Sequence, residues 1–239
     1  MPGMPHSTDF LTPPGAEWPL PHPLPGVALF STQFDPQRLD ADAFARHGVA
    51  APENIARSVA KRRAEYLAGR LCARAALQQL NGRAECPTLG ADRAPQWPAG
   101  TCGSITHSDG WAAAIVARQS DWQGLGLDAE TLLDDARAER LQGEILTPAE
   151  SQRLDPAQRA LCVTLTFSLK EALFKALYPL VQKRFYFEHA EVLNWDTNGH
   201  ARLRLLCDLS ARWHNGSELD AQYARFDGRL LSLVSVAAD

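Results

Sequence analysis

Two short segments space their charged residues differently: the first at the spacing of a strand and the second at the spacing of a helix. In 124–130 (GLGLDAE), Asp128 and Glu130 share a face if the segment is a strand, because strand side chains alternate. In 168–175 (SLKEALFK), Glu171 and Lys175 share a face if the segment is a helix. Where the two elements meet, three carboxylates and an ammonium would converge. Such a set can hold Mg²⁺ against a phosphate ester, because Mg²⁺ prefers oxygen ligands.

The stretch 161–175 has two apolar periods at once. Every second residue of 163–169 is apolar, as in a strand, while leucines recur at 165, 169, 173 and 177, as in a helix. The preceding residues favour the helix, because TPAE at 147–150 and DPAQ at 155–158 have the form of capping boxes with proline at the first helical position. We therefore expect a helix that begins at Pro156 and ends at Tyr178, before Pro179.

Other patterns predict a second long helix and several short strands. Apolar residues recur at helical spacing through 53–80, and Asn81-Gly82 is a natural helix stop. Asp109-Gly110 indicates a hairpin. Strands are expected at 27–32, 102–106, 111–117, 185–195, 201–206 and 230–237, with another that ends at Asp128. The expected fold class is α+β, with two similar subdomains that each combine a mainly antiparallel sheet and a long helix.

Proline content and polarity divide the chain into an arm and two halves. Residues 1–26 hold eight of the sixteen prolines and little periodicity, which predicts an extended arm that is laid over the surface or partly disordered. The polar stretch 118–123 is the candidate domain boundary. The expected units are therefore the arm at 1–26, an N-terminal subdomain at 27–120 and a C-terminal subdomain at 121–239.

Composition argues against several classes of protein. The net charge of −4 argues against a nucleic-acid partner, which requires a basic surface, while 45% hydrophobic residues suffice for a core. No apolar run reaches the ~18 residues that a membrane span requires, and no secretory signal is visible. The five scattered cysteines match neither a disulfide framework nor a zinc motif. We therefore expect a cytoplasmic protein without a membrane partner.

Each motif also has an ordinary explanation when it is taken alone. Asp128 and Glu130 would be solvated acids at a strand end, and Glu171 and Lys175 a surface ion pair worth about 0.3–0.5 kcal/mol. His107 would be a hydrogen-bonded histidine near a turn. The 124–129 segment matches a dinucleotide fingerprint only loosely, because Asp128 would put negative charge where a pyrophosphate should sit. The functional hypothesis therefore rests on the motifs in combination.

In combination and order, the motifs resemble the 4′-phosphopantetheinyl transferases, and most of all the branch typified by enterobactin synthetase component D, related to the surfactin-synthetase-activating type. The segments are RRAEYLAGR at 62–70, RAPQWPAG at 93–100, GSITHS at 103–108, GLGLDAE at 124–130 and FSLKEALFK at 167–175. The G-x-D-x-E and S-x-K-E-x-x-x-K pair is the specific part. One departure is Phe167, where many relatives carry tryptophan, and it leaves the acidic residues untouched.

The resemblance implies a pseudo-twofold monomer of two α+β subdomains, with CoA and Mg²⁺ in the cleft between them. It implies that Asp128, Glu130 and Glu171 are the metal ligands and that Lys175 contacts the pyrophosphate. Phosphate would also be bound by Thr106 and His107. The candidates for the 3′-phosphate and adenosine end are Lys61, Arg62, Arg70 and Arg93. These roles agree with the suitability of guanidinium groups for phosphate.

The implied reaction transfers the 4′-phosphopantetheine group of CoA to a serine hydroxyl of an apo acyl carrier or peptidyl carrier protein and releases 3′,5′-ADP. Lys175 and Mg²⁺ would neutralise charge on the leaving group. Glu171 is the natural candidate for the base. A metal-bound water is the alternative, because a metal-bound carboxylate is a poorer base than a free one. The sequence leaves open which carrier proteins are used, whether fatty-acid, polyketide, peptide or siderophore.

Two other functions would use the same residues. One is a different Mg²⁺-dependent phosphodiester hydrolase, with water as the acceptor, which would consume CoA steadily without a carrier protein. The other is a non-catalytic module that binds CoA or a nucleotide whether or not Mg²⁺ is present. The intact set of Asp128, Glu130 and Glu171 argues against the second.

Overall fold

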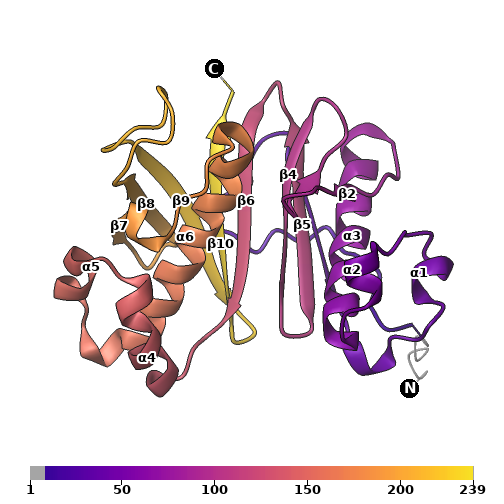
Figure 1. The fold of residues 1–239 in the computed structure, drawn as a ribbon, viewed down its shortest axis with the longest axis horizontal. Coiled ribbons are helices and arrows are strands. Elements are labelled where there is room, and N and C mark those ends of the chain that lie inside the picture. Colours follow the sequence, from indigo (N-terminus) through magenta and orange to yellow (C-terminus); the bar gives the residue numbers. More distant parts are fainter. Residues whose placement is uncertain (1–8, 239) are drawn as a thin grey trace.

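The chain forms two antiparallel sheets that lie side by side, each with a long helix packed against it (Figure 1). The computed structural model describes residues 9–238. The smaller sheet has the order β1-β5-β4, and the helix that packs on it is α3 (Ala60–Asn81). Its strands are β1 (Ala28–Gln33), β4 (Thr101–Ser108) and β5 (Trp111–Arg118). A two-stranded sheet joins β2 (Thr88–Leu89) to β3 (Pro95–Gln96).

The larger sheet has the order β6-β10-β9-β8-β7, and the helix that packs on it is α6 (Arg159–Val181). Its strands are β6 (Trp122–Thr131), β7 (Ala190–Trp195), β8 (His200–Leu205), β9 (Glu218–Phe226) and β10 (Arg229–Ala237). Helices α4 (Asp135–Ile145) and α5 (Pro148–Arg153) precede α6, and α1 (Ala43–Arg46) and α2 (Glu53–Ala56) precede α3. The expected α+β class, with two sheet-and-helix units, is confirmed.

Side-chain hydroxyls join the two sheets along the line where β4 faces β6, and we call this line the hydroxyl seam. The Ser104 hydroxyl accepts a hydrogen bond from the Leu127 amide at 3.0 Å. Two residues further along β4, the Thr106 hydroxyl accepts one from the Ala129 amide at 2.9 Å. The spacing of two brings both hydroxyls to the same side of β4. The seam therefore fixes β6, and with it the acidic residues 128 and 130, against β4.

Two glycines let α6 approach β6 closely. A Cβ at Gly126 would lie 1.8 Å from the Ala172 carbonyl oxygen, and one at Gly124 would lie 2.5 Å from that of Ala176. Both neighbours are backbone atoms, so the helix could not yield locally. The G-x-G of this segment thus serves helix packing, and the packing brings Glu171 alongside the β6 acids.

The expected long helices are confirmed, with different ends. The 155–158 segment forms a 3-10 turn (Pro156–Gln158), so α6 itself begins at Arg159. The helix continues past Pro179 and ends at Val181; the capping residue Gln182 has φ of +51°, and its amide bonds to the Tyr178 carbonyl. Proline has no amide to bond to the carbonyl of residue 175, and the helix ends two residues after it. The box at 147–150 is confirmed, and it caps the short α5.

Several other expected boundaries are wrong. The helix predicted over 53–80 is broken into α2 and α3, although its stop at Gly82, with φ of +76°, is confirmed. The strand predicted to end at Asp128 continues to Thr131, and the one predicted over 185–195 begins only at Ala190, after a 3-10 turn (Phe187–His189). Helix α4 and strand β9 were not expected, because their apolar residues are small or widely spaced among charged ones.

The described part of the proline-rich arm, residues 9–26, is extended and crosses behind the strands (Figure 1). It pairs with β1 between Gly15 and Ser31, and the Pro25 carbonyl accepts a hydrogen bond from the Trp122 indole at 3.0 Å. Phe10 and Leu20 are buried in the core. The arm is therefore a packed part of the fold over this range, and residues 1–8 lie outside the described residues.

Within residues 9–238, no helix combines the length and the apolar character needed to cross a bilayer.

Candidate active site

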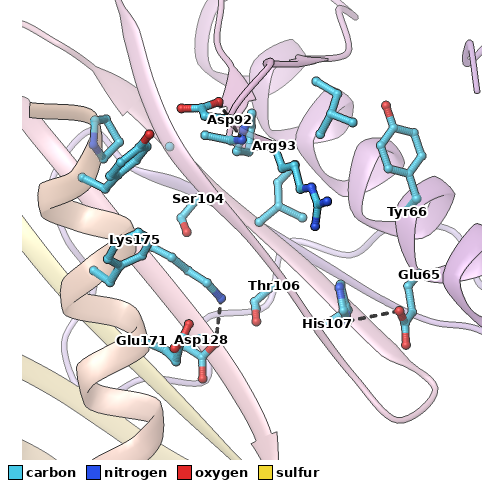
Figure 2. Close-up of a pocket in the computed structure, with 18 of the residues that line it drawn as sticks. Glu65, Tyr66, Asp92, Arg93, Ser104, Thr106, His107, Asp128, Glu171 and Lys175 are labelled. Carbon is cyan, nitrogen blue, oxygen red and sulfur yellow. Dashed lines mark hydrogen bonds and ion pairs between the residues drawn. The ribbon is translucent and has the colours of Figure 1, made fainter. Parts of the chain in front are cut away.

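A cavity of about 460 Å³ lies between the two long helices, above the hydroxyl seam (Figure 2). Side chains from both halves of the chain line it. The sequence-predicted residues among the lining are Arg62, Arg70, Arg93, Thr106, His107, Asp128, Glu130, Glu171 and Lys175. Lys61 is not among them; its ammonium is exposed and lies 3.6 Å from the Asp109 carboxylate. Residues far apart in the chain thus meet in one cavity.

An ion pair between Lys175 and Asp128 forms the floor of the cavity on the α6 side (Figure 2). The Lys175 Nζ donates to Asp128 Oδ1 at 2.6 Å and to the Leu127 carbonyl at 3.2 Å. Asp128 is only 4% exposed, and its second oxygen, Oδ2, is buried without a hydrogen-bond partner among the described residues. A buried carboxylate oxygen without a donor is costly, so this atom is suited to receive a cation.

The other two acids, Glu130 and Glu171, are half-buried and interact with the charge of Asp128. Burial, followed by the charge of Asp128, raises the pKa of Glu130 to about 7, and Lys175 partly opposes this shift. Burial also raises the pKa of Glu171, again against the effect of Lys175. The three carboxylates therefore repel one another, and the single ammonium does not fully compensate them.

The donor set fits a hard divalent cation. Among the described residues, no three acidic, histidine or cysteine side chains lie in a ready-made metal cage. Mg²⁺ does not need one, since it keeps several waters and is commonly bound through one or two carboxylates and a substrate phosphate. Such an ion would give the unpartnered Asp128 oxygen a partner, and it would reduce the repulsion that the acids at positions 130 and 171 experience.

On the α3 side, His107 lies between Arg62 and Glu65. The Arg62 Nη1 is 2.9 Å from His107 Nε2. A guanidinium can only donate, so Nε2 accepts and the proton is on Nδ1, which lies 3.7 Å from the Glu65 carboxylate. Burial, with the charges of Arg62, Lys175 and Lys61, lowers the pKa of His107 to about 4. This imidazole is therefore neutral at physiological pH.

Deeper in the same wall, Arg70 is 4% exposed, with its guanidinium 4.5 Å from the centre of the Tyr66 ring. Its Nε has no hydrogen-bond partner among the described residues. A buried guanidinium with an unused donor that lines a cavity is suited to bind an anion, and stacking on the ring holds it in place.

The loop between β2 and β3 forms the rim of the cavity. Arg93 has φ of +72°, which is rare for a residue with a side chain, and its amide bonds to the Gly90 carbonyl at 2.9 Å. A hydrogen bond from Tyr178 to Asp92 reaches across to α6 and raises the pKa of the phenol. The rim is thus closed by a contact between the two halves of the chain.

The sequence interpretation assigned no role to eight polar or aromatic lining residues: Glu65, Tyr66, Asp92, Trp97, Ser104, Phe174, Tyr178 and Arg184. Glu65 could have been found, because it lies one helical turn after Arg62 on the face that carries the predicted phosphate ligands. Asp92 and Tyr178 meet only through the tertiary fold, and no local pattern signals their contact.

Lys170 lies on the other side of α6 from the cavity. It is 3% exposed and donates to Glu150 Oε2 at 2.8 Å, to the Ile145 carbonyl at 2.8 Å and to the Phe187 carbonyl at 3.0 Å. Its contacts therefore hold α5, α6 and the 187–189 turn together.

Comparisons with known proteins agree with this geometry. Residues 50–117 match the model of the 4′-phosphopantetheinyl transferase N-terminal domain, and residues 124–228 match that of the 4′-phosphopantetheinyl transferase superfamily. Enterobactin synthase component D from Escherichia coli O157:H7 is 34% identical over 177 residues, which cover 73% of this chain and 81% of that protein. The chain therefore belongs to the 4′-phosphopantetheinyl transferase superfamily, and it is a transferase.

Other relatives match over shorter stretches. The 4′-phosphopantetheinyl transferase Npt from Nocardia iowensis is 37% identical over 139 residues, and the match spans 58% of this chain but only 62% of that protein. A solved holo-(acyl-carrier-protein) synthase from Bacillus anthracis covers 50% of this chain and 99% of its own, with 18% identity and a TM-score of 0.33. A likeness of that size supports no argument about the site.

Proposed function

We propose that this transferase moves the 4′-phosphopantetheine group of CoA onto a serine hydroxyl of an apo acyl carrier or peptidyl carrier protein, with Mg²⁺, and releases 3′,5′-ADP. One observation carries the proposal. A single cavity combines an incompletely compensated carboxylate group on the α6 side with buried or half-buried cationic side chains on the α3 side. A substrate with a pyrophosphate at one end and a further phosphate at the other has the matching charge distribution.

The cationic wall is assigned to the nucleotide end of CoA. Arg62, Arg70 and Arg93 are the candidates for the 3′-phosphate and the adenosine, since guanidinium groups bind phosphate through paired hydrogen bonds. Thr106 and His107 lie on β4 between the two charged regions; Thr106 is assigned to a phosphate oxygen directly, and His107 indirectly, through Arg62. With the proton of His107 on Nδ1 toward Glu65, a phosphate is best met by the Arg62 guanidinium that its Nε2 orients.

The acidic centre is assigned to the reacting phosphate. Asp128, Glu130 and Glu171 would hold Mg²⁺, which when bound would neutralise charge on the pyrophosphate. The serine oxygen forms a bond to the phosphorus that carries the pantetheine arm, and the bond from that phosphorus to the oxygen of 3′,5′-ADP breaks. Glu171 is the proposed acceptor of the serine proton, and a water held by Mg²⁺ is the alternative; burial raises the pKa of Glu171, whereas binding to the ion would lower it. Lys175 is assigned to the leaving group.

Further proposals concern the protein as a whole. We propose a monomer with an N-terminal subdomain at 27–120 and a C-terminal subdomain at 121–239, with the arm packed across both. The hydroxyl seam supports this division, because it joins β4 to β6 without a backbone ladder. A reducing, cytoplasmic location is supported by five free cysteines in the described chain.

The decisive experiment mixes the protein with CoA, Mg²⁺ and an apo carrier protein and follows the carrier by intact mass spectrometry. The expected result is a mass gain of one phosphopantetheinyl group, absent when the acceptor serine is replaced by alanine. An apo peptidyl carrier protein of siderophore type is the first acceptor to test, because enterobactin synthase components are among the relatives. Consumption of CoA without any acceptor would contradict the proposal and indicate a hydrolase. Binding of CoA that does not depend on Mg²⁺ and yields no product would indicate a non-catalytic binding module.

A further inference from the structure

A pair of histidines far from the cavity joins the proline-rich arm to the larger sheet. His22 of the arm and His200 of β8 have their Nε2 atoms 3.1 Å apart, with ring centroids 4.9 Å apart and planes inclined by 26°. Both side chains are exposed, so an ion from solvent can reach them. Neither residue lines the cavity of the candidate active site.

The backbone fixes this pair in place. The His22 amide donates to Gln222 Oε1 at 2.8 Å, and Gln222 is the cross-strand partner of His200 in the β8–β9 ladder. Pro21, just before His22, packs against Gly199, just before His200; a Cβ on that glycine would lie 2.6 Å from the proline ring. The two imidazoles are therefore held together by contacts other than their own, which reduces the entropy cost of bringing them to a common ligand.

The geometry of the rings suits one shared metal ion. Imidazole nitrogens 3.1 Å apart, each bound at about 2.1 Å, subtend about 95° at the ion and place the ring centroids about 4.8 Å apart. A linear hydrogen bond between the same nitrogens would place the centroids about 5.4 Å apart. The observed separation of 4.9 Å is close to the first arrangement.

We propose that His22 and His200 form a binding site for a borderline transition-metal ion of the Zn²⁺ class, separate from the Mg²⁺ site of the proposed reaction. Both Nε2 atoms would give their lone pairs to the ion, each imidazole would carry its proton on Nδ1, and waters would fill the remaining positions. Imidazole favours Zn²⁺, Ni²⁺ and Cu²⁺, whereas Mg²⁺ prefers oxygen ligands. The ion would clasp residue 22 to residue 200 and so tie the arm to the larger sheet.

The test is a calorimetric titration of Zn²⁺ into the full-length protein, beside His22→Gln and His200→Gln variants. We expect each variant to lose the same single binding equivalent and the Zn²⁺-dependent rise in melting temperature that accompanies it. Mg²⁺ should produce neither signal at this site. The matched control is His214→Gln, an exposed histidine whose ring contacts the neighbouring Asn215 carbonyl, and it should bind Zn²⁺ as the wild type does.

Zn²⁺ that binds at cysteines or at the acidic centre contributes equally to the titrations of wild type and variants, because those ligands are unchanged. The difference between the two titrations therefore reports only on the histidine pair. Wild-type binding in both histidine variants would overturn the proposal. So would a loss confined to one variant, since a shared ion requires both rings. These readouts do not involve transfer activity, so the outcome is independent of whether the proposed function holds. Circular dichroism of the variants confirms that they are folded.

Discussion

The Lys175 ammonium and the Asp128 carboxylate form a 2.6 Å ion pair in which only one of the two carboxylate oxygens is used. Lys175 thus provides part of the positive charge that three neighbouring acids require. In the proposed reaction, Asp128 would help to hold Mg²⁺ through its unpartnered oxygen, and the Lys175 ammonium would be available to a phosphate. The pair would therefore link the charge state of the site to the availability of Lys175, the lysine that we propose acts on the leaving group.

Lys175→Ala should lower kcat by about 100-fold, because the lost interaction is expected to strengthen as charge develops on the leaving group. KM for CoA should change much less. Steady-state kinetics with a saturating apo carrier protein measures both. A variant with reduced affinity but wild-type kcat would show that Lys175 only binds the ground state.

Lys170→Met is the matched control on the same helix. Its ammonium bonds to Glu150 and two carbonyls away from the cavity, so kcat should stay near wild type while the melting temperature falls. The expected loss of stability is about 3 kcal/mol, because Glu150 is left as an unpaired buried charge. Thermal unfolding and kinetics on the same preparation separate the two effects. A greater kcat loss than in Lys175→Ala would refute the assignment.

Asp128→Ala and Glu171→Ala should abolish Mg²⁺-dependent transfer and leave the fold intact. In the wild type, Mg²⁺ should raise the melting temperature, since it binds only the folded acids, and EDTA should reverse the rise. Both variants should lack this response. If either transfers phosphopantetheine at the wild-type rate with Mg²⁺, the residue is not a ligand.

Arg62→Ala and Arg93→Ala should raise KM for CoA far more than KM for 3′-dephospho-CoA, because the second substrate lacks the phosphate that these side chains are proposed to bind. Lys61→Ala provides the comparison, as this ammonium is exposed outside the cavity and a small effect is expected. Equal losses with both substrates would assign the arginines to another part of CoA.

His107 should make the fold more sensitive to acid. Its pKa is about 4 in the folded protein and about 6.5 in the unfolded chain, so between these values the unfolded chain binds more protons. The stability that the neutral imidazole contributes is present above pH 6.5 and is lost as the pH falls toward 4. His107→Gln should therefore lose less stability than the wild type between pH 7.5 and 5, as measured by urea unfolding. Parallel losses would contradict the lowered pKa.

Gly126→Ala should destabilise the protein by about 3 kcal/mol, because the added methyl would overlap a backbone oxygen of α6 that cannot move alone. Gly143→Ala is the opposite case: this glycine lies in α4, and a Cβ there would meet no atom within 4 Å. It should gain about 0.5–1 kcal/mol through helix propensity. Chemical unfolding of both variants tests the pair, and a neutral Gly126→Ala would show that α6 packs less closely.

Local signals predicted the parts of the fold that are determined locally. The Gly82 stop, the Asp109-Gly110 hairpin and the capping box at 147–150 are each set by a few neighbouring residues, and each is confirmed. Strand β9 escaped prediction because its buried residues include only one leucine, with Ala221 and Tyr223 as the others. Its position is determined by pairing with β8 and β10, which no short pattern contains.

The same division holds for the site. The spacings of Asp128 with Glu130 and of Glu171 with Lys175 correctly placed these residues on shared faces, since each face belongs to one element. Other features depend on contacts between elements. They are the Lys175–Asp128 pair, the Asp92–Tyr178 contact and the position of Lys61 outside the cavity. They depend on how closely α6 approaches β6 and on where the β2–β3 loop crosses the cavity.

The hydroxyl seam also affects how the protein behaves at high concentration. A strand at the margin of a sheet presents unpaired amides that can recruit a strand from another molecule and start aggregation. Here the hydroxyls of Ser104 and Thr106 accept hydrogen bonds from the amides of Leu127 and Ala129 at the inner margin of the larger sheet. At the outer margin of the smaller sheet, the arm pairs with Ser31. The protein can therefore leave its cavity open to a partner without offering these strands for unwanted pairing.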